Sequence, residues 1–396
     1  MRLRLRLLAV LALAACSSGG TPPAPPPAEI SIPLPSAQEV ASRELTADDQ
    51  IRQALDRLTF GARPTDYDSV RAMGVDRWIA RQLDPGRIAD PAADKFVAQF
   101  PVLHSDPATL FSDYPEPKVE KRKDGKPMTA EDSAKLKEIG RKSRQLTGDL
   151  QAAKVGRAVV SERQLNEVMV DFWFNHFNIY AAKGPERYYL PQYERDVIRP
   201  YALGHFRDLL GAVAHSPAML FYLDNWESRA NPNEPVLVTQ RGNGGRRGMP
   251  RGAPAFGPPP TAAKRQAQGL NENYARELLE LHTLGVDGGY TQEDVINVAR
   301  AFTGWSIEKP QQVGSFVFRA EWHDAGAKVV LGHKLAAGNG MEDGEHVLDI
   351  VAHDPHTATH IAMQLAMRFV SDSPPPDLVQ RAANTFLETR GDPGCI

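Results

Sequence analysis

Apolar residues recur every three or four positions along most of the chain after Thr46, the spacing that places them on one face of an α-helix. Thr46 followed by Asp49 is typical of a helix N-terminus, and Gly61 is typical of the residue that ends a helix. The next segment starts in the same way at Thr65 and stops at Gly74. This pattern predicts short helices that follow one another in antiparallel order.

The most apolar of the predicted helices begins at Ser161, which forms a capping box with Gln164. Apolar side chains cover most of its circumference, and His176 lies on the same side as Met169 and Phe172. We therefore expect this helix to be central and buried.

One part of the chain has the composition of strands. Residues 316–318 and 329–331 are β-branched, aromatic or aliphatic and flank the sequence WHDAGAK, which predicts a small β-hairpin near 316–331. Three further helices are expected between residues 342 and 389. The chain is thus predicted to be mainly α, with a single large multi-helix domain over residues 46–396 and the hairpin as a minor element.

Two stretches interrupt the helical pattern. Near residues 114–130 the composition turns polar and basic around the helix-breaking sequence DGKP. The other stretch, residues 240–265, has six glycines and five prolines between positions 241 and 260. Such compositions bury too little apolar surface to offset the entropy of ordering, so both stretches are predicted to be disordered insertions.

The N-terminus has the pattern of a bacterial export signal. Arginines at positions 2, 4 and 6 precede an apolar run, and residues 13–16, LAAC, resemble a lipobox. We expect residues 1–15 to be a lipoprotein signal peptide, Cys16 to be acylated, and residues 16–45 to form a Pro-rich tether. An ordinary cleaved secretory signal is the alternative.

These features predict where the protein is and what holds it there. The lipid on Cys16 would bind it to a membrane of the cell envelope, and Ser17 favours the outer membrane. Cys395 is the other cysteine of the chain, so no intrachain disulfide framework is expected. The net charge of −3 argues against a general polyanion-binding protein, and we expect no nucleic-acid partner.

A polar helix near residues 270–283 has a high density of ionisable side chains. On a helical wheel, Asn273, Arg276, Glu277 and Glu280 fall on one side and His282 falls on the other. One interpretation is a solvated face with ion pairs between residues four apart. The other is a cleft in which Asn273 and Glu280 bind substrate, while Arg276 and Glu277 act catalytically.

His323 and Asp324 are the preferred partners of that cleft, because they lie at the predicted hairpin tip. If the tip folds over Arg276 and Glu277, His323 becomes a general acid or base. The alternative is a local turn in which Asp324 bonds to backbone N–H groups.

Two further polar groups follow predicted helices. Asn175 and His176 end the central helix, and Asp224 and Asn225 follow a helix that opens at Ser216 and Pro217. We consider His176 as catalytic and the other three as substrate-binding, all lining one opening. The alternative for His176 is a core histidine with satisfied nitrogens.

Histidine spacing raises the question of a metal. His356 and His360 lie one helical turn apart, a zinc- or copper-binding spacing, but no third ligand is evident. A buried alternative pairs His176 and His282 with Glu277. We interpret the first two as surface histidines and predict no metal and no cofactor. The common hydrolase, zinc-protease and P-loop signatures do not occur in the sequence.

Four blocks of sequence carry a resemblance to a known family. They are VMVDFWFNHFNIYAAKG (168–184), IRPYALGHFRDLL (198–210), HSPAMLFYLDNWES (215–228) and LNENYARELLELHTLGVDGGYTQEDV (270–295). They resemble the bacterial domain of unknown function 1800 family, over most of the chain from about Thr46 to about Asp392. The resemblance implies a secreted, mainly helical protein without an established activity.

The same resemblance implies two further expectations. Family members continue beyond the point where this chain ends in GDPGCI, so a C-terminal part of the domain is expected to be missing. They are often encoded beside another uncharacterised secreted family, which implies a secreted protein partner.

Two functions follow as hypotheses. The first is an acid/base hydrolase-like enzyme of the envelope that acts on a polar polymer, with Glu277 or His323 as proton carrier and Arg276 as anion clamp. It predicts a concave, charged pocket. The alternative is a non-catalytic binding or assembly lipoprotein, which predicts an exposed apolar or aromatic patch.

Overall fold

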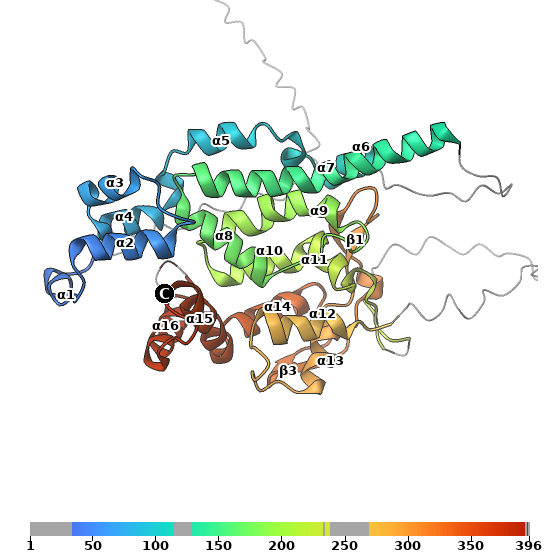
Figure 1. Cartoon of the computed structure of the whole chain (residues 1–396). Helices are drawn as coiled ribbons and strands as arrows, with labels where there is room; N and C mark the ends of the chain where they lie inside the picture. The colour runs from blue at the N-terminus through green and yellow to red at the C-terminus, as the bar shows by residue number, and fades with distance from the viewer. Residues whose placement is uncertain (1–33, 115–128, 233, 238–268, 393, 395–396) are drawn as a thin grey trace, which may run out of the picture. The chain divides into compact units, whose positions relative to one another are not determined.

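The computed structural model describes residues 34–114, 129–232, 234–237, 269–392 and 394 (Figure 1). The predicted signal peptide, Cys16 and most of the tether and of both insertions lie outside these residues. Part of the predicted tether is described, and there Ala37–Ala41 form one short helix with Ser36 and Glu39 as its capping box.

The described residues form sixteen α-helices. The α-helices are α1 (Ala37–Ala41), α2 (Ala47–Leu58), α3 (Asp66–Met73), α4 (Val75–Gln82), α5 (Pro91–Val97), α6 (Pro107–Asp113), α7 (Ala130–Val160), α8 (Gln164–His176), α9 (Glu186–Gln192), α10 (Phe206–His215), α11 (Pro217–Tyr222), α12 (Glu272–Glu277), α13 (Gln292–Ala301), α14 (Glu342–Ala352), α15 (Pro355–Phe369) and α16 (Pro376–Glu388). The π-helices are η3 (Tyr193–Ile198) and η7 (Leu278–His282), and the 3₁₀-helices are η1 (Pro85–Arg87), η2 (Pro101–His104), η4 (Arg199–Tyr201), η5 (Asn225–Glu227) and η8 (Ala320–Trp322). The prediction of a mainly α fold is confirmed.

Two separate two-stranded antiparallel sheets accompany the helices. In the first, β1 (Trp305–Glu308) pairs with β2 (Ser315–Phe318); in the second, β3 (Lys328–Val330) pairs with β4 (His333–Leu335). Both predicted strands therefore exist as β2 and β3, but the prediction that they pair with each other is wrong. The WHDAGAK segment lies in the connection between the two sheets rather than at a hairpin tip.

Local sequence explains why the second hairpin was missed. Its two-residue turn consists of Leu331 and Gly332, which both have positive φ angles of 48° and 80°. Asn or Gly normally occupies the first of these positions, because a branched or bulky side chain is strained there. The N–H of Leu331 donates to Asp294 Oδ1 at 2.7 Å, a tertiary contact that helps to hold the turn.

The main core is built around α8 and the helices that pack on it and on one another. Leu165, Val168, Met169 and Trp173 of α8 are buried, which confirms the prediction of a central buried helix. Its predicted start is wrong: Ser161 ends α7 and its hydroxyl donates to Asp90, so it does not cap α8.

A smaller core joins α2, α3 and α4. Thr46 accepts a hydrogen bond from the N–H of Asp49 at 3.2 Å and begins α2, as predicted. Gln82 then links this group to the start of α8, because its side chain bonds to the backbone of Glu162 and Leu165.

The packing order also brings two connections together. α9 packs on α11, and α11 packs on η5 and β1 (Figure 1). The loop that follows α8 and the turn that follows α11 consequently lie at the same place in the fold. None of the helices in the described part of the chain is long and apolar enough to cross a membrane.

Candidate functional site

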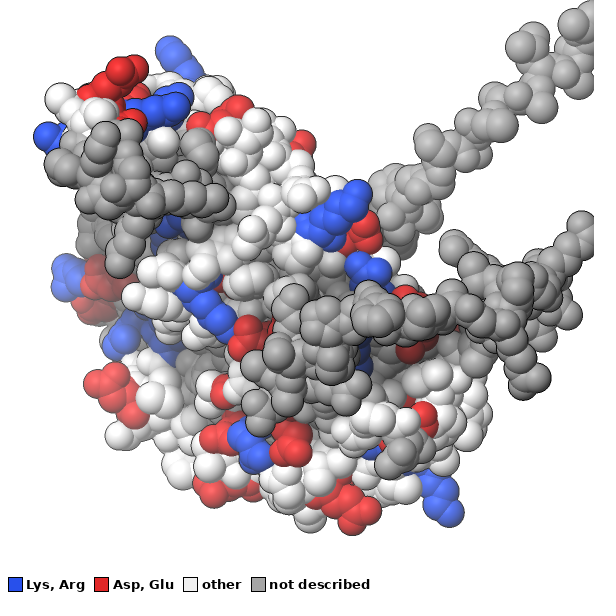
Figure 2. Space-filling view, turned by 90° about the vertical axis from the view of Figure 1, so that its right-hand side faces the viewer, with Lys and Arg blue, Asp and Glu red and all other residues white. Residues whose placement is uncertain are grey.

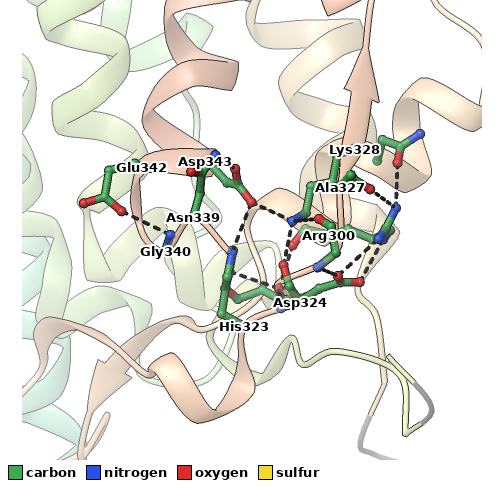
Figure 3. A network of polar contacts seen from close by, with 12 residues as sticks. Arg300, His323, Asp324, Ala327, Lys328, Asn339, Gly340, Glu342 and Asp343 are labelled. Atoms are coloured by element: carbon green, nitrogen blue, oxygen red, sulfur yellow. Dashed lines mark hydrogen bonds and ion pairs between the residues drawn. The ribbon is translucent and has the colours of Figure 1, made fainter. Parts of the chain in front are cut away.

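His323 and Asp324, the preferred catalytic pair of the sequence analysis, belong to an enclosed polar network (Figure 3). Asp343, near the start of α14, accepts from Lys328 Nζ at 2.6 Å and from Asn339 Nδ2 at 3.0 Å, and its Oδ2 lies 3.3 Å from His323 Nε2. The side chains of His323, Lys328 and Asp343 are all fully buried. The network therefore ties β3 to α14 and leaves no open space for a substrate beside these groups.

Asp324 is paired in the same interior. Arg300 of α13 donates two hydrogen bonds to the Asp324 carboxylate, at 2.8 and 3.1 Å. The backbone carbonyl oxygen of Asp324 accepts a hydrogen bond from Lys328 Nζ. His323 Nδ1 lies 2.8 Å from the carbonyl oxygen of Thr303. The predicted placement of His323 and Asp324 at an exposed tip is thus corrected: packing of α13 and α14 around the segment encloses it.

Hydrogen bonding keeps the central carboxylate of the network charged. Burial raises the pKa of Asp343, but hydrogen bonds from His323, Lys328 and Asn339 outweigh it and hold that pKa below its ordinary value. A buried charge with this many donors is a stable structural centre.

Arg276, Glu277 and Glu280 lie elsewhere, on the surface formed by α12, η7 and α13. Arg276 Nη2 donates to Gln292 Oε1 at 2.9 Å, and Glu280 accepts from the Tyr290 hydroxyl at 3.2 Å. Burial and the neighbouring Glu280 raise the pKa of Glu277. No hydrogen bond or ion pair among the described residues joins this group to His323, so the structure does not assemble the predicted cleft from these two segments.

His176 meets two other histidines at the end of α8. Its Nδ1 lies 2.9 Å from Gln364 Oε1 and its Nε2 lies 3.1 Å from the carbonyl oxygen of His282, while His360 bonds to the same Gln364. Burial lowers the pKa of His176 to about 4 and that of His282 to about 3. Both histidines are therefore neutral, and the two ring nitrogens of His176 both have partners. Asn175 lies exposed beside His176.

The two metal alternatives have no counterpart in the geometry. His356 bonds to Asp354 and His360 bonds to Gln364, so the two rings have different partners. His176 and His282 do lie near each other, with ring centroids 6.4 Å apart, but no described contact adds Glu277 to them. Within the described residues, no three His, Cys, Asp or Glu side chains are arranged to hold a metal ion.

Two predicted binding residues do come together, at the turn between α11 and η5. Lys183, in the loop after α8, donates from Nζ to Asp224 Oδ1 at 2.8 Å and to the carbonyl oxygen of Tyr222. From the other side, Asn273 Nδ2 donates to the carbonyl oxygen of Leu223 at 3.4 Å. We call Lys183, Glu186, Asp224 and Asn273 the polar junction; it joins α9, α11 and α12 through their ends.

Asp224 has an uncommon backbone conformation. Its φ of 61° and ψ of 17° are left-handed, a region that costs free energy for residues other than glycine, although Asp tolerates it better than most. The turn aims the carboxylate outward, where its side chain is 54% exposed and that of Lys183 is 34% exposed. A residue held in this conformation at a ligand-accessible turn is a candidate for function.

Glu186 lies behind this pair and is the residue that the sequence analysis missed. It is fully buried, and neither carboxyl oxygen has a hydrogen-bond partner within the described residues. Burial raises the pKa of Glu186 to about 9, Lys183 lowers it and Asp224 raises it. The carboxyl group is therefore protonated at neutral pH, so a carboxylic acid stands next to a solvent-accessible ion pair.

Asn225 has a different role from the one predicted. Its side chain is fully buried, and Nδ2 donates to the carbonyl oxygens of Phe302 and Trp305 at 3.1 and 3.2 Å. It anchors η5 to the end of α13 and the start of β1, and so positions the neighbouring Asp224.

The distribution of surface charge does not point to a binding site. Lys and Arg are interspersed with Asp and Glu over the face seen in Figure 2, in keeping with the small net charge. Two hollows in the described part of the chain have other linings; one of them lies beside Arg63, Trp78 and Glu162.

Comparison with known proteins supplies a family and no named relative. No curated protein and no solved structure matches the chain. The family model described as protein of unknown function, DUF1800, matches residues 53–393, which is most of the chain. The protein therefore belongs to the DUF1800 family.

Proposed function

We propose that this protein is a lipid-anchored enzyme of the cell envelope that hydrolyses a polar polymer by acid/base chemistry at the polar junction. The observation that carries this proposal is the buried, protonated carboxyl group of Glu186, which lies beside the Lys183–Asp224 pair and has no hydrogen-bond partner among the described residues. A neutral carboxylic acid at pH 7 is a general acid, which is the role for which enzymes raise carboxyl pKa values.

Each residue of the junction has a distinct part in this proposal. Lys183 and Asp224 are accessible and form the polar contacts to the polymer, with Asn273 beside them. Glu186 supplies its proton to the leaving oxygen once a ligand displaces the Lys183–Asp224 pair. Water adds to the other fragment, and the proton that water releases returns to the Glu186 carboxylate. Localisation through Cys16 and the export signal is part of the same proposal.

The test is hydrolysis of envelope polymers by purified protein and by a Glu186→Gln variant. Glutamine keeps the size of the side chain and cannot supply the proton, so the rate should fall by about a hundredfold or more. The wild-type rate should also fall as the pH rises through about 9, where Glu186 ionises. Glu293→Gln, which removes an exposed carboxylate on α13, is the matched control and should keep the wild-type rate.

A binding or assembly lipoprotein is the second candidate, and an apolar surface favours it. Leu281, Val286, Met363 and Met367 are between 37% and 68% exposed, and His360 lies beside Leu281 and Gly285. Surfaces of this kind often bind proteins. The same variant separates the candidates: full biological function of Glu186→Gln in a deletion strain would contradict the enzyme and leave binding.

A further inference from the structure

The guanidinium groups of two arginines lie over the indole ring of Trp322. The guanidinium carbon of Arg229 lies 3.5 Å from the centroid of the indole ring, and that of Arg319 lies 4.9 Å from it. Cation–π contacts at these distances hold both cations in place. The backbone fixes the arrangement as well, because the N–H of Ala230 donates to the carbonyl oxygen of Trp322 at 2.8 Å.

The charges of these arginines are poorly compensated. The Arg229 guanidinium makes no hydrogen bond or ion pair to any described residue, and the buried Nε atoms of both arginines have no acceptor there. Arg319 has one ion pair, to Glu308 at 3.4 Å, and the Glu308 side chain is 39% exposed. Burial and the neighbouring Arg319 lower the pKa of Arg229, more than Glu227 and Glu321 raise it.

Other arginines of the fold differ from this pair. Arg300 donates twice to Asp324, and Arg199 bonds to both Glu167 and Glu194. In these two cases a partly buried arginine has carboxylate partners that match its charge. At Trp322, the guanidinium groups of Arg229 and Arg319 lie over the same ring, and N–H donors of both have no acceptor among the described residues.

We propose that Arg229 and Arg319, held together by Trp322, bind an oxyanion, either a carboxylate or a phosphate group, on the polymer. Guanidinium groups donate paired hydrogen bonds to either group, and an anion between them would relieve their mutual repulsion. Arg229 is five residues from Asp224, so the two Cα atoms lie at most about 18 Å apart, within reach of one extended ligand. The polymer rests on the proposed function, whereas the oxyanion site rests on the geometry of the two arginines.

The experiment is calorimetric titration of the purified full-length chain with two separate probes, inorganic phosphate and a trigalacturonate. We expect at least one probe to bind, more weakly at high salt, and Arg229→Gln to weaken that binding about tenfold or more. Binding of phosphate assigns the site to a phosphate group, and binding of the uronate alone assigns it to a carboxylate. Arg368→Gln is the matched control, since Arg368 lies over the ring of Phe369 without a second cation.

The outcomes are distinct from those for Glu186. Glu186→Gln should bind the probe as tightly as the wild type, so loss of the catalytic proposal leaves this one intact. Absence of binding by both probes, or equal weakening in Arg229→Gln and Arg368→Gln, would overturn the oxyanion site. Should Arg229→Gln fail to fold, Arg319→Gln carries the same expectation.

Discussion

Asp343 and Glu186 both have fully buried carboxyl groups, yet the pKa values of these groups are shifted in opposite directions. Asp343 has hydrogen bonds from Lys328 and Asn339 and contacts His323, and its pKa is lowered. Glu186 has no hydrogen bond from a described residue, and its pKa is raised to about 9. The difference shows that burial alone does not set the charge of a carboxyl group; the number of donors around it does.

The surroundings of the two groups differ in the same sense. The Asp343 network connects α13, β3 and α14 (Figure 3), and the side chains of His323, Lys328 and Asp343 at its centre are fully buried, as expected for a structural centre. Glu186 adjoins a turn with a left-handed Asp224 and a solvent-accessible ion pair. We infer that unsatisfied and strained groups at the junction are kept for function, since neither stabilises the fold.

The largest effect is expected at Asp343. Asp343→Asn removes the negative charge and leaves the buried ammonium group of Lys328 uncompensated, so the free energy of unfolding should fall by about 3–5 kcal/mol. Urea denaturation at neutral pH measures it. A Lys328→Met, Asp343→Leu double variant should recover much of the loss, because it removes both charges. A stable single variant would contradict the structural role of the network.

Glu186→Gln should have a smaller effect on stability, with the opposite sign. Because the pKa of Glu186 is raised from 4.5 to about 9, the folded state binds more protons than the unfolded state between these values. Its favourable contribution is complete below about pH 4.5 and is lost as the pH rises. The glutamine variant should therefore gain stability relative to the wild type as the pH rises from 5 to 8, by up to about 1.4 kcal/mol per pH unit.

Thermal or urea unfolding of both proteins across this pH range provides the measurement. A constant difference between them would mean that Glu186 is ionised in the fold, with donors that the comparison with Asp343 leaves out. The two carboxyl groups would then be alike, and Glu186 would lose its claim to act as an acid.

Local patterns in the sequence predicted local structure well. The cap at Thr46 and the apolar surface of α8 depend on residues a few positions apart, and the structure has both. The fate of Ser161 depended on Asp90, which is 71 residues away, and no local pattern contains that information. The mainly α class was predictable because helices depend on such local patterns. The strand pairing was not predictable, because it depends on contacts that no local pattern contains.

The site was predictable only in part, for similar reasons. Asp224 and Asn273 were predicted to bind substrate as members of two separate groups, and both bond around the same turn, since each follows or begins a helix. No local pattern predicts that Asp343, 20 residues later, encloses His323. Glu186 escaped notice because an acid in the first turn of a helix is ordinary, and its exceptional feature, the lack of any donor, exists only in three dimensions.

The smallest effect is expected at Asp224, and it tests whether the junction is strained. Asp224→Gly relieves the left-handed conformation but loses an exposed ion pair, worth about 0.2–1 kcal/mol, and adds flexibility to the unfolded chain. The gain from the relieved conformation and the two losses nearly cancel, so the free energy of unfolding should change little. Asp224→Ala loses the same ion pair and keeps the strain, so it should be less stable than the glycine variant by about 1 kcal/mol. Equal stabilities from chemical denaturation would mean that the turn costs nothing at position 224, and the contrast with the Asp343 network would then rest on Glu186 alone.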